Sequence, residues 1–221
     1  MNLSTVKSIE IPEGIVKRIT RNGTVLWEKK TSRLPEGYIE TEYTGFSGTQ
    51  YINIGIAPTS SRSFWLDFLA ADDCSTGIAS GSTAKTIFDF NRKSSSSWRC
   101  YYTKSEGYKS FTAALNTRHT IYIDYCNKLA GLDDSSTSFT NSAYCSTTFC
   151  LGAFRESGRY YYYLDGNCYS FRVKENDVLI ADFVPCYRES DGRNGFYDIV
   201  RDTFYDNERS ASVNLVRGPE I

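Results

Sequence analysis

The chain has 221 residues, of which 15% are aromatic, and its 25 basic and 26 acidic residues give a net charge of −1. Well-mixed charges exclude the basic footprint of a protein that binds nucleic acid or anionic lipid. No apolar run approaches the roughly 20 residues that cross a bilayer, and the first residues lack the pattern of a signal peptide. We therefore expect synthesis in a cytoplasm, with no membrane insertion and no nucleic-acid partner.

Residues 1–31 are predicted to form a small β unit. Val6 to Ile11 has the composition of a strand. Ile15 to Arg21 and Thr24 to Lys29 flank Asn22-Gly23, the strongest short hairpin signal, because both central positions of such a turn require positive φ. The unit is therefore expected to contain a β-hairpin.

A piece of this size cannot bury a core of its own. We therefore expect Val25, Leu26 and Trp27 to pack on the main domain, on a symmetry mate or on another protein. Edge strands of this kind pair readily with other chains. Residues 1–31 are accordingly predicted to be a docking or oligomerisation segment, followed by one main domain over residues 32–221.

The main domain is predicted to be all-β. It is rich in Tyr and Phe, and short stretches of alternating polar and apolar residues are separated by Gly, Pro, Ser and Asp. Strands at this spacing, without an amphipathic helix, indicate a two-sheet antiparallel sandwich. The predicted strands are Tyr38–Tyr43, Thr49–Ile56, Ser63–Ala70, Lys85–Asn91, Trp98–Thr103, Arg118–Cys126, Thr148–Phe154, Tyr163–Lys174, Val178–Tyr187, Gly195–Ile199 and Val213–Val216.

Two of these strands, one near each end of the domain, are predicted to share its core. Tyr51 and Ile52 supply candidate buried side chains from the first strand. Phe183 and Val184 supply them from the second. The two ends of the domain are thus expected to meet in one sandwich.

The seven cysteines do not have the spacing of a zinc site. Cys145 and Cys150 are separated by four residues, and the single histidine, His119, lies elsewhere in the sequence. An odd count made in a reducing compartment favours free thiols that pack as small hydrophobic side chains. No metal or cofactor is predicted from the cysteines at positions Cys74, Cys100, Cys126, Cys145, Cys150, Cys168 and Cys186.

Catalytic patterns are not found. Glu40 and Glu42 form the one Glu-x-Glu pair and share a strand face, where a solvated surface explains them better than a glycosidase pair. With one histidine and no Gly-x-Ser-x-Gly elbow, His119 is predicted to be an ordinary strand residue. Asp72-Asp73 and Asp133-Asp134 offer oxygen atoms of the kind that calcium binds, but two adjacent carboxylates do not make a site.

Aromatic residues supply the candidate ligand-binding groups. One set surrounds the Trp98–Tyr108 hairpin, and a second follows Gly158 in the run Tyr160–Tyr163. Strand alternation predicts that Tyr160 and Tyr162 face one way and that Tyr161 and Tyr163 face the other. The rings either fill sheet faces or display a platform for sugar rings. The candidate ligand-binding residues are Trp98, Arg99, Tyr102, Lys104, Tyr108, Arg159, Tyr160 and Tyr162.

Five motifs carry a family resemblance. In chain order they are LPEGY, which begins at Leu34, then GTQYI, YSF, DFVPC and the closing GFYDIV with TFY. Together they resemble the laminin-G-like, concanavalin A-like jelly-roll domains of bacteriophage and prophage structural proteins. The resemblance implies a jelly roll preceded by a short β-hairpin segment. It specifies function less closely, because jelly rolls host many unrelated activities.

The resemblance implies a non-enzymatic phage virion component that displays a jelly roll for carbohydrate or host-surface binding. Its expected partners are other virion proteins, reached through residues 1–31, a host-surface glycan and further copies of the same chain. The expected location is the virion, after synthesis in the bacterial host cytoplasm. Two alternatives remain: a structural or decorating virion protein without a ligand, and a glycan-active enzyme.

Overall fold

The computed structural model describes residues 18–21, 24–28, 32–71, 77–82, 87–94, 97–103, 107–140, 147–156, 159–210 and 213–221. Every regular element in these ranges is a β-strand, which confirms the all-β prediction. The chain divides into two compact units, residues 1–32 and 33–221. Among the described residues we find no helix with the length and apolar character of a membrane span.

The N-terminal unit contains the predicted hairpin. Strands β1 (Arg18–Arg21) and β2 (Thr24–Glu28) pair antiparallel, with Arg21 opposite Thr24. The predicted strand Val6–Ile11 lies outside the described residues, as do the side chains of the docking residues Val25, Leu26 and Trp27. Docking through this unit therefore remains a prediction.

The larger sheet of the main unit is antiparallel throughout. Its long central strands alternate buried and mostly half-buried side chains, because one face covers the core. Its main path follows β13 (Ser135–Ser138), β12 (Leu129–Leu132), β11 (Arg118–Asp124), β6 (Arg62–Ala70), β17 (Asp165–Glu175), β18 (Val178–Arg188), β19 (Arg193–Asp198) and β20 (Thr203–Tyr205), flanked by β3 (Tyr38–Glu40), β4 (Thr44–Ser47) and β21 (Val216–Arg217).

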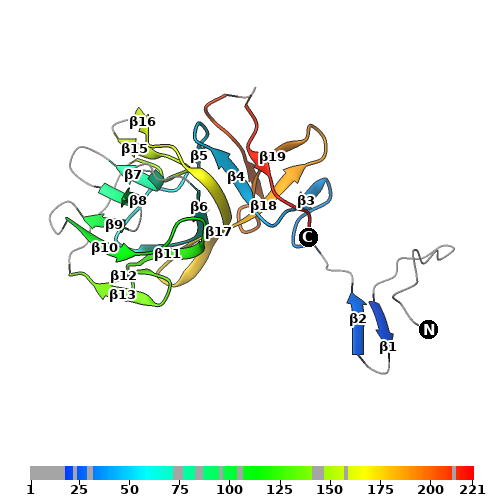
Figure 1. Ribbon diagram of the computed structural model, residues 1–221, viewed down its shortest axis with the longest axis horizontal. Coiled ribbons are helices and arrows are strands. Elements are labelled where there is room, and N and C mark those ends of the chain that lie inside the picture. Colours follow the sequence, from blue (N-terminus) through cyan, green and yellow to red (C-terminus); the bar gives the residue numbers. More distant parts are fainter. Residues whose placement is uncertain are drawn as a thin grey trace. The chain divides into compact units, whose positions relative to one another are not determined.

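Four strands of the smaller sheet, β7 to β10, form a meander. The chain leaves β6, forms these four strands and returns to β11, which pairs with β6 (Figure 1). The path of the smaller sheet follows β10 (Gly107–Thr112), β9 (Ser97–Thr103), β8 (Ile87–Ser94), β7 (Gly77–Ser82), β14 (Cys150–Leu151) and β5 (Ile52–Asn53); β7 also pairs with β15 (Phe154–Glu156), and β15 pairs with β16 (Arg159–Tyr161). The β15–β7 pair is parallel and the others are antiparallel.

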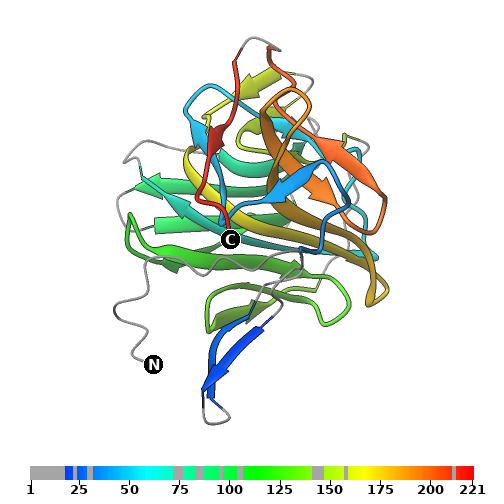
Figure 2. The same ribbon diagram turned by 90° about the vertical axis from the view of Figure 1, so that its right-hand side faces the viewer.

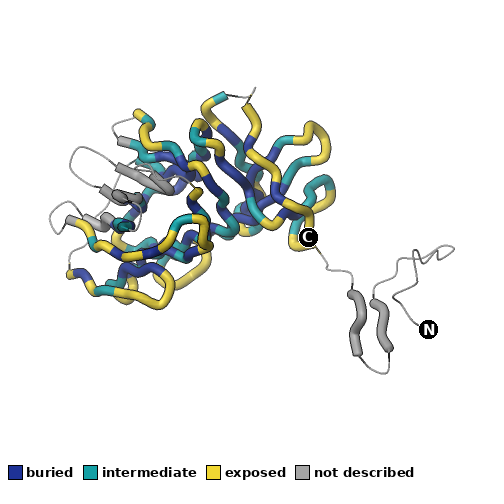
Figure 3. The backbone as a smooth tube through the Cα atoms, viewed as in Figure 1, coloured by how far each residue is buried: buried dark blue, intermediate teal, exposed yellow. Residues whose placement is uncertain are grey.

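The two sheets bury a single aromatic core between them. Phe149, just before β14, packs against both Phe64 of β6 and Phe171 of β17, with ring centroids 4.8 Å and 5.6 Å away. Phe90 and Trp98 of the smaller sheet belong to the same fully buried cluster. Figure 3 shows buried segments inside the sandwich and exposed segments at its turns. The predicted antiparallel sandwich of the jelly-roll type is therefore confirmed.

The two predicted end strands meet in this core. Ile52 and Phe183 belong to the same buried cluster, and Val184 is also buried. Tyr51 is half-buried instead, because Ile52 takes the inward position of this alternating pair. The C-terminal segment adds a short strand to the larger sheet, where β21 pairs with β4 (Figure 2).

Strand boundaries show where the sequence prediction differs from the structure. The predicted strand Thr49–Ile56 is reduced to Ile52–Asn53, because Gln50 Oε1 accepts the Ser47 amide at 2.7 Å and so closes a turn before it.

After β14 the chain reverses at Gly152, which has a φ of +82°. A Cβ atom there would lie 2.4 Å from the Phe46 ring, so glycine is required.

Most of the described cysteines behave as predicted. Cys100, Cys150, Cys168 and Cys186 are buried free thiols, whereas Cys126 is exposed. Burial raises the pKa of the Cys186 thiol to about 12, and it also raises the pKa values of the other three buried thiols well above the ordinary value. These four side chains therefore stay protonated and pack as apolar groups.

Replacing Phe183 tests the shared core. The ring is fully buried and lies 5.5 Å from Phe171 and 5.4 Å from Tyr205. We expect Phe183→Ala to lower the free energy of unfolding by about 3–5 kcal/mol, measured by urea denaturation. The control Val178→Ala, on the same strand but 65% exposed, should change it by less than about 0.5 kcal/mol. Equal effects would contradict the packing.

Candidate functional site

The tyrosine run divides into two faces in an order that differs from the prediction. Tyr160 and Tyr163 both approach Tyr51, with ring centroids 3.7 Å and 6.5 Å away. Tyr161 and Tyr162 lie 6.3 Å from each other. The predicted alternation fails because β16 ends at Tyr161 and Tyr162 has a φ of +50°. That left-handed conformation turns two consecutive rings toward the same side.

The outward pair forms an exposed aromatic group with Phe154, which pairs with Tyr161 across the β15–β16 hairpin. We call Phe154, Tyr161 and Tyr162 the aromatic platform. Its ring centroids are separated by 6.1 to 6.5 Å, and Tyr161 and Tyr162 are 39% and 59% exposed. A bulky residue at positive φ is strained, and such strain is concentrated at ligand-binding positions.

The other pair, Tyr160 and Tyr163, packs on the opposite side of the run from the aromatic platform. Tyr160 stacks on Tyr51 with an interplanar angle of 16°, and the guanidinium of Arg155 lies 5.3 Å from the Tyr160 ring centroid. Arg155 Nη1 donates to Thr148 Oγ1 at 2.8 Å, which fixes the hairpin to the strand region before β14. Burial raises the pKa of Tyr160, and nearby Arg155 partly opposes this rise. Tyr160, predicted as a ligand contact, therefore has one ring face covered by Tyr51.

Trp98 is not a surface residue, and the prediction that it binds a ligand is wrong. Its side chain is fully buried and lies edge-on to Phe68 at 4.9 Å. Its Nε1–H donates to the Ala113 carbonyl at 3.3 Å. Because the indole donor is satisfied inside the protein, the large ring is buried without leaving an unpaired polar group.

The neighbouring residue, Arg99, lies on the opposite, outward face of β9. Its guanidinium carbon is 4.0 Å from the centroid of the Tyr108 ring, and its Nη2 donates to the Tyr108 hydroxyl at 3.2 Å. Tyr108 is 42% exposed. Two predicted ligand residues are thus brought together as a cation–π pair on adjacent strands.

The structure describes the other predicted ligand residues only in part. Arg159 is exposed in β16, opposite Glu156. Tyr102 belongs to β9, but its side chain is outside the described part of the structure. Lys104 lies outside the described residues altogether. The described site residues therefore form two groups, the aromatic platform with Arg159 and the Arg99–Tyr108 pair.

Sequence reasoning missed a buried carboxyl group in β8. Asp89 is 1% exposed, and its neighbour Phe90 points into the core, so Asp89 lies on the outer face of the smaller sheet. Asn91 Nδ2 donates to its Oδ2, while Oδ1 has no hydrogen-bond partner in the structure as described. Burial raises the pKa of Asp89 to about 8, and the Asn91 hydrogen bond opposes the rise. The available signal was a carboxyl group, Asp89, between Phe88 and Phe90 in a predicted strand.

The carboxylates that were considered for catalysis or calcium have structural partners. Glu40 ends β3 and accepts from Arg33 Nη2 at 2.7 Å, so it does not form a strand pair with the exposed Glu42. Asp133 Oδ2 lies 2.7 Å from His119 Nδ1, and its Oδ1 accepts the Thr120 amide at 2.8 Å. Asp72 and Asp73 lie outside the described residues.

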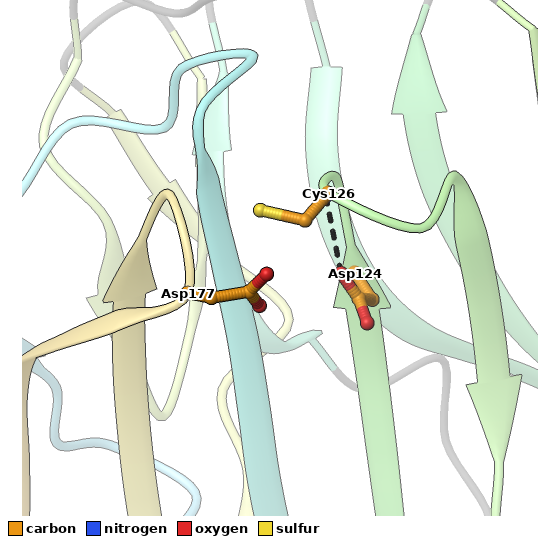
Figure 4. A group of neighbouring side chains, drawn as sticks. All are labelled: Asp124, Cys126 and Asp177. Atoms are coloured by element: carbon orange, nitrogen blue, oxygen red, sulfur yellow. Dashed lines mark hydrogen bonds between the residues drawn. The ribbon is translucent and has the colours of Figure 1, made fainter.

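One group of possible metal ligands was not predicted. The ligand atoms of Asp124, Cys126 and Asp177 all lie within 4.8 Å of one another where the turns after β11 and β17 meet (Figure 4). Asp124 Oδ1 already accepts the backbone amides of Cys126 and Asn127, each at 3.1 Å. Cys126 and Asp177 are exposed. The turn geometry thus accounts for Asp124, and we assign no metal to this group.

Neither a protein-family model nor a curated protein matches the chain. Similar solved structures include the CBM40 of the Ruminococcus gnavus IT-sialidase bound to α2,3-sialyllactose, at 14% identity and a TM-score of 0.45, covering 64% of this chain and 92% of that chain. Another structure of that CBM40 has 16% identity and a TM-score of 0.42, covering 67% and 94%. A mutant of the Streptococcus pneumoniae NanB sialidase has 13% identity and a TM-score of 0.44, covering 63% and 27%. At these identities the similarity concerns the fold alone.

The buried Asp89 carboxyl group predicts a pH-dependent stability. Its pKa is about 8 in the folded chain and ordinarily 3.8, so between these pH values the folded state retains a proton that the unfolded chain releases. The contribution of the protonated Asp89 carboxyl group to the free energy of unfolding is therefore fully present below about pH 4. It is lost as the pH rises to about 8. Asp89→Asn removes this loss, which is on the order of 5 kcal/mol.

Thermal denaturation of the parent and of Asp89→Asn at mildly acidic and at mildly alkaline pH checks this prediction. We expect the advantage of the variant over the parent to grow from mildly acidic to mildly alkaline pH, because over that range ionisation stabilises the unfolded parent chain while the folded carboxyl group retains its proton. An identical difference between the two proteins at both pH values would show that Asp89 does not titrate in this way.

Proposed function

We propose that residues 32–221 form a non-catalytic carbohydrate-binding module. The observation that carries the proposal is the aromatic platform, in which Tyr161 and Tyr162 expose adjacent rings backed by the Tyr51–Tyr160 stack. Aromatic faces pack on the apolar faces of sugar rings, while tyrosine hydroxyls remain in water. The exposed guanidinium of Arg159, on the same hairpin, supplies hydrogen-bond donors for sugar hydroxyls or carboxylates.

The non-catalytic part of the proposal is supported by how the candidate catalytic groups are used. His119 is buried, with Nδ1 beside the Asp133 carboxylate and Nε2 2.9 Å from the Ala114 carbonyl. Glu40 is held by Arg33. These contacts anchor strand ends and turns, so neither group is positioned as an acid or base beside an exposed aromatic surface.

We further propose that this module is carried on a bacteriophage or prophage virion and binds a host-surface glycan. The support is the sequence resemblance of LPEGY, GTQYI, YSF, DFVPC and GFYDIV with TFY to jelly rolls of phage structural proteins. In this proposal residues 1–31 attach the module to other virion proteins or to further copies of the chain. A decorating virion protein without a ligand is the second candidate, and glycan binding separates the two.

A glycan array probed with the purified chain tests the carbohydrate proposal. We expect binding that Tyr162→Asn weakens several-fold, because the ring is lost while asparagine tolerates the positive φ. The matched control is Tyr169→Ala, which removes a half-buried tyrosine of the larger sheet. The guanidinium carbon of Arg118 lies 4.1 Å from the centroid of that ring. This control should leave glycan binding intact. A parent chain that binds no glycan in the array would favour the decorating role.

Removing residues 1–31 tests the docking proposal. The hairpin and the main domain are separate compact units. We therefore expect the shortened chain to keep its melting temperature and its glycan binding, and to lose self-association or attachment to particles. Calorimetry and light scattering measure the two properties. Unfolding of the shortened chain would instead make this segment an integral part of the sandwich.

A further inference from the structure

The strand order of the smaller sheet places the two groups of candidate ligand residues at opposite edges. At the end of the sheet where Glu156 pairs with Ser82, the strands follow the order β10, β9, β8, β7, β15 and β16 (Figure 1). The Arg99–Tyr108 pair belongs to β9 and β10 at one edge. The aromatic platform belongs to β15, β16 and the residue after it at the other edge.

The separation of these two edges exceeds the size of one sugar ring. Five strand spacings lie between β10 and β16, which corresponds to roughly 24 Å across the sheet. A pyranose ring is about as wide as a single strand spacing. One sugar residue therefore contacts one edge or the other, and contact with both edges requires a chain of several residues.

The strand between the edges contributes a polar group without a complete set of partners. Asp89 of β8 lies on the face away from the core, as does Arg99 of the adjacent β9. Asp89 Oδ1 lacks a hydrogen-bond partner among the groups the structure describes, and an unpaired buried polar atom is costly. The Asp89 carboxyl group is covered, so β8 marks the middle of this face and Asp89 is not itself a ligand contact.

From this arrangement we infer that the ligand is an extended oligosaccharide that crosses the strands of the smaller sheet, with one end on the aromatic platform and the other on the Arg99–Tyr108 pair. The inference rests on the proposed carbohydrate binding and adds the length and direction of the ligand. Exposed aromatic rings at both edges supply the stacking contacts.

Chain-length dependence tests the inference. The probes are chitooligosaccharide, maltooligosaccharide and β-1,3-glucooligosaccharide ladders, each from monosaccharide to octasaccharide, titrated into the full chain by calorimetry. We expect affinity to rise with length by at least roughly fivefold between disaccharide and octasaccharide, as a second ring contact is added. Equal affinity for disaccharide and octasaccharide would overturn the inference and leave the carbohydrate-binding proposal standing. Absence of binding to any ladder and to the glycan array would defeat both.

Paired variants locate the two ends. We expect Tyr108→Ala and Tyr162→Asn each to weaken octasaccharide binding roughly fivefold, whereas only one of them should affect the disaccharide. Tyr169→Ala is the control for loss of a tyrosine elsewhere, and an unchanged melting temperature shows that each variant is folded. An octasaccharide that loses affinity in Tyr162→Asn but not in Tyr108→Ala would confine the site to the platform and overturn the inference.

Discussion

The contact of Phe149 with Phe64 and Phe171 is the interaction on which the rest of the domain depends. Phe149 comes from the smaller sheet, and its two neighbours come from adjacent strands of the larger one, so the stack joins the layers. Phe90 meets the same ring edge-on at 6.1 Å. With the interior filled by these rings, polar side chains of β8 and β9 are directed to the outer face, where the candidate site is formed.

Strand alternation predicted the long strands well and the site poorly. Phe64, Leu66 and Phe68 alternate with polar or half-buried residues over a full strand, so the pattern alone identified β6 and its inward face. Short strands such as β12 and β13 lack this signal, because Gly131 and the Ser/Thr residues of β13 carry little apolar pattern. β12 is placed by pairing with β11, and β13 by pairing with β12; periodicity does not encode either contact.

The errors at the site have two local causes. Trp98 was placed at the surface because its sequence neighbours are polar, but the Ala113 carbonyl satisfies its indole N–H in the core. Tyr162 was assigned to the face of Tyr160, but its left-handed backbone breaks the alternation. That same conformation holds the Tyr162 ring beside Tyr161 in the chain without ligand, so the proposed glycan binding would cost less conformational freedom at this residue.

The buried thiols bear on the redox conditions under which the described core packs. Cys100, Cys150, Cys168 and Cys186 fill core positions as neutral side chains, and none of them is joined to another cysteine. The packing of these four side chains therefore needs no oxidant. Exposed Cys126 is accessible to a thiol-reactive dye, which makes the turn after β11 a place to attach a fluorophore without disturbing the interior.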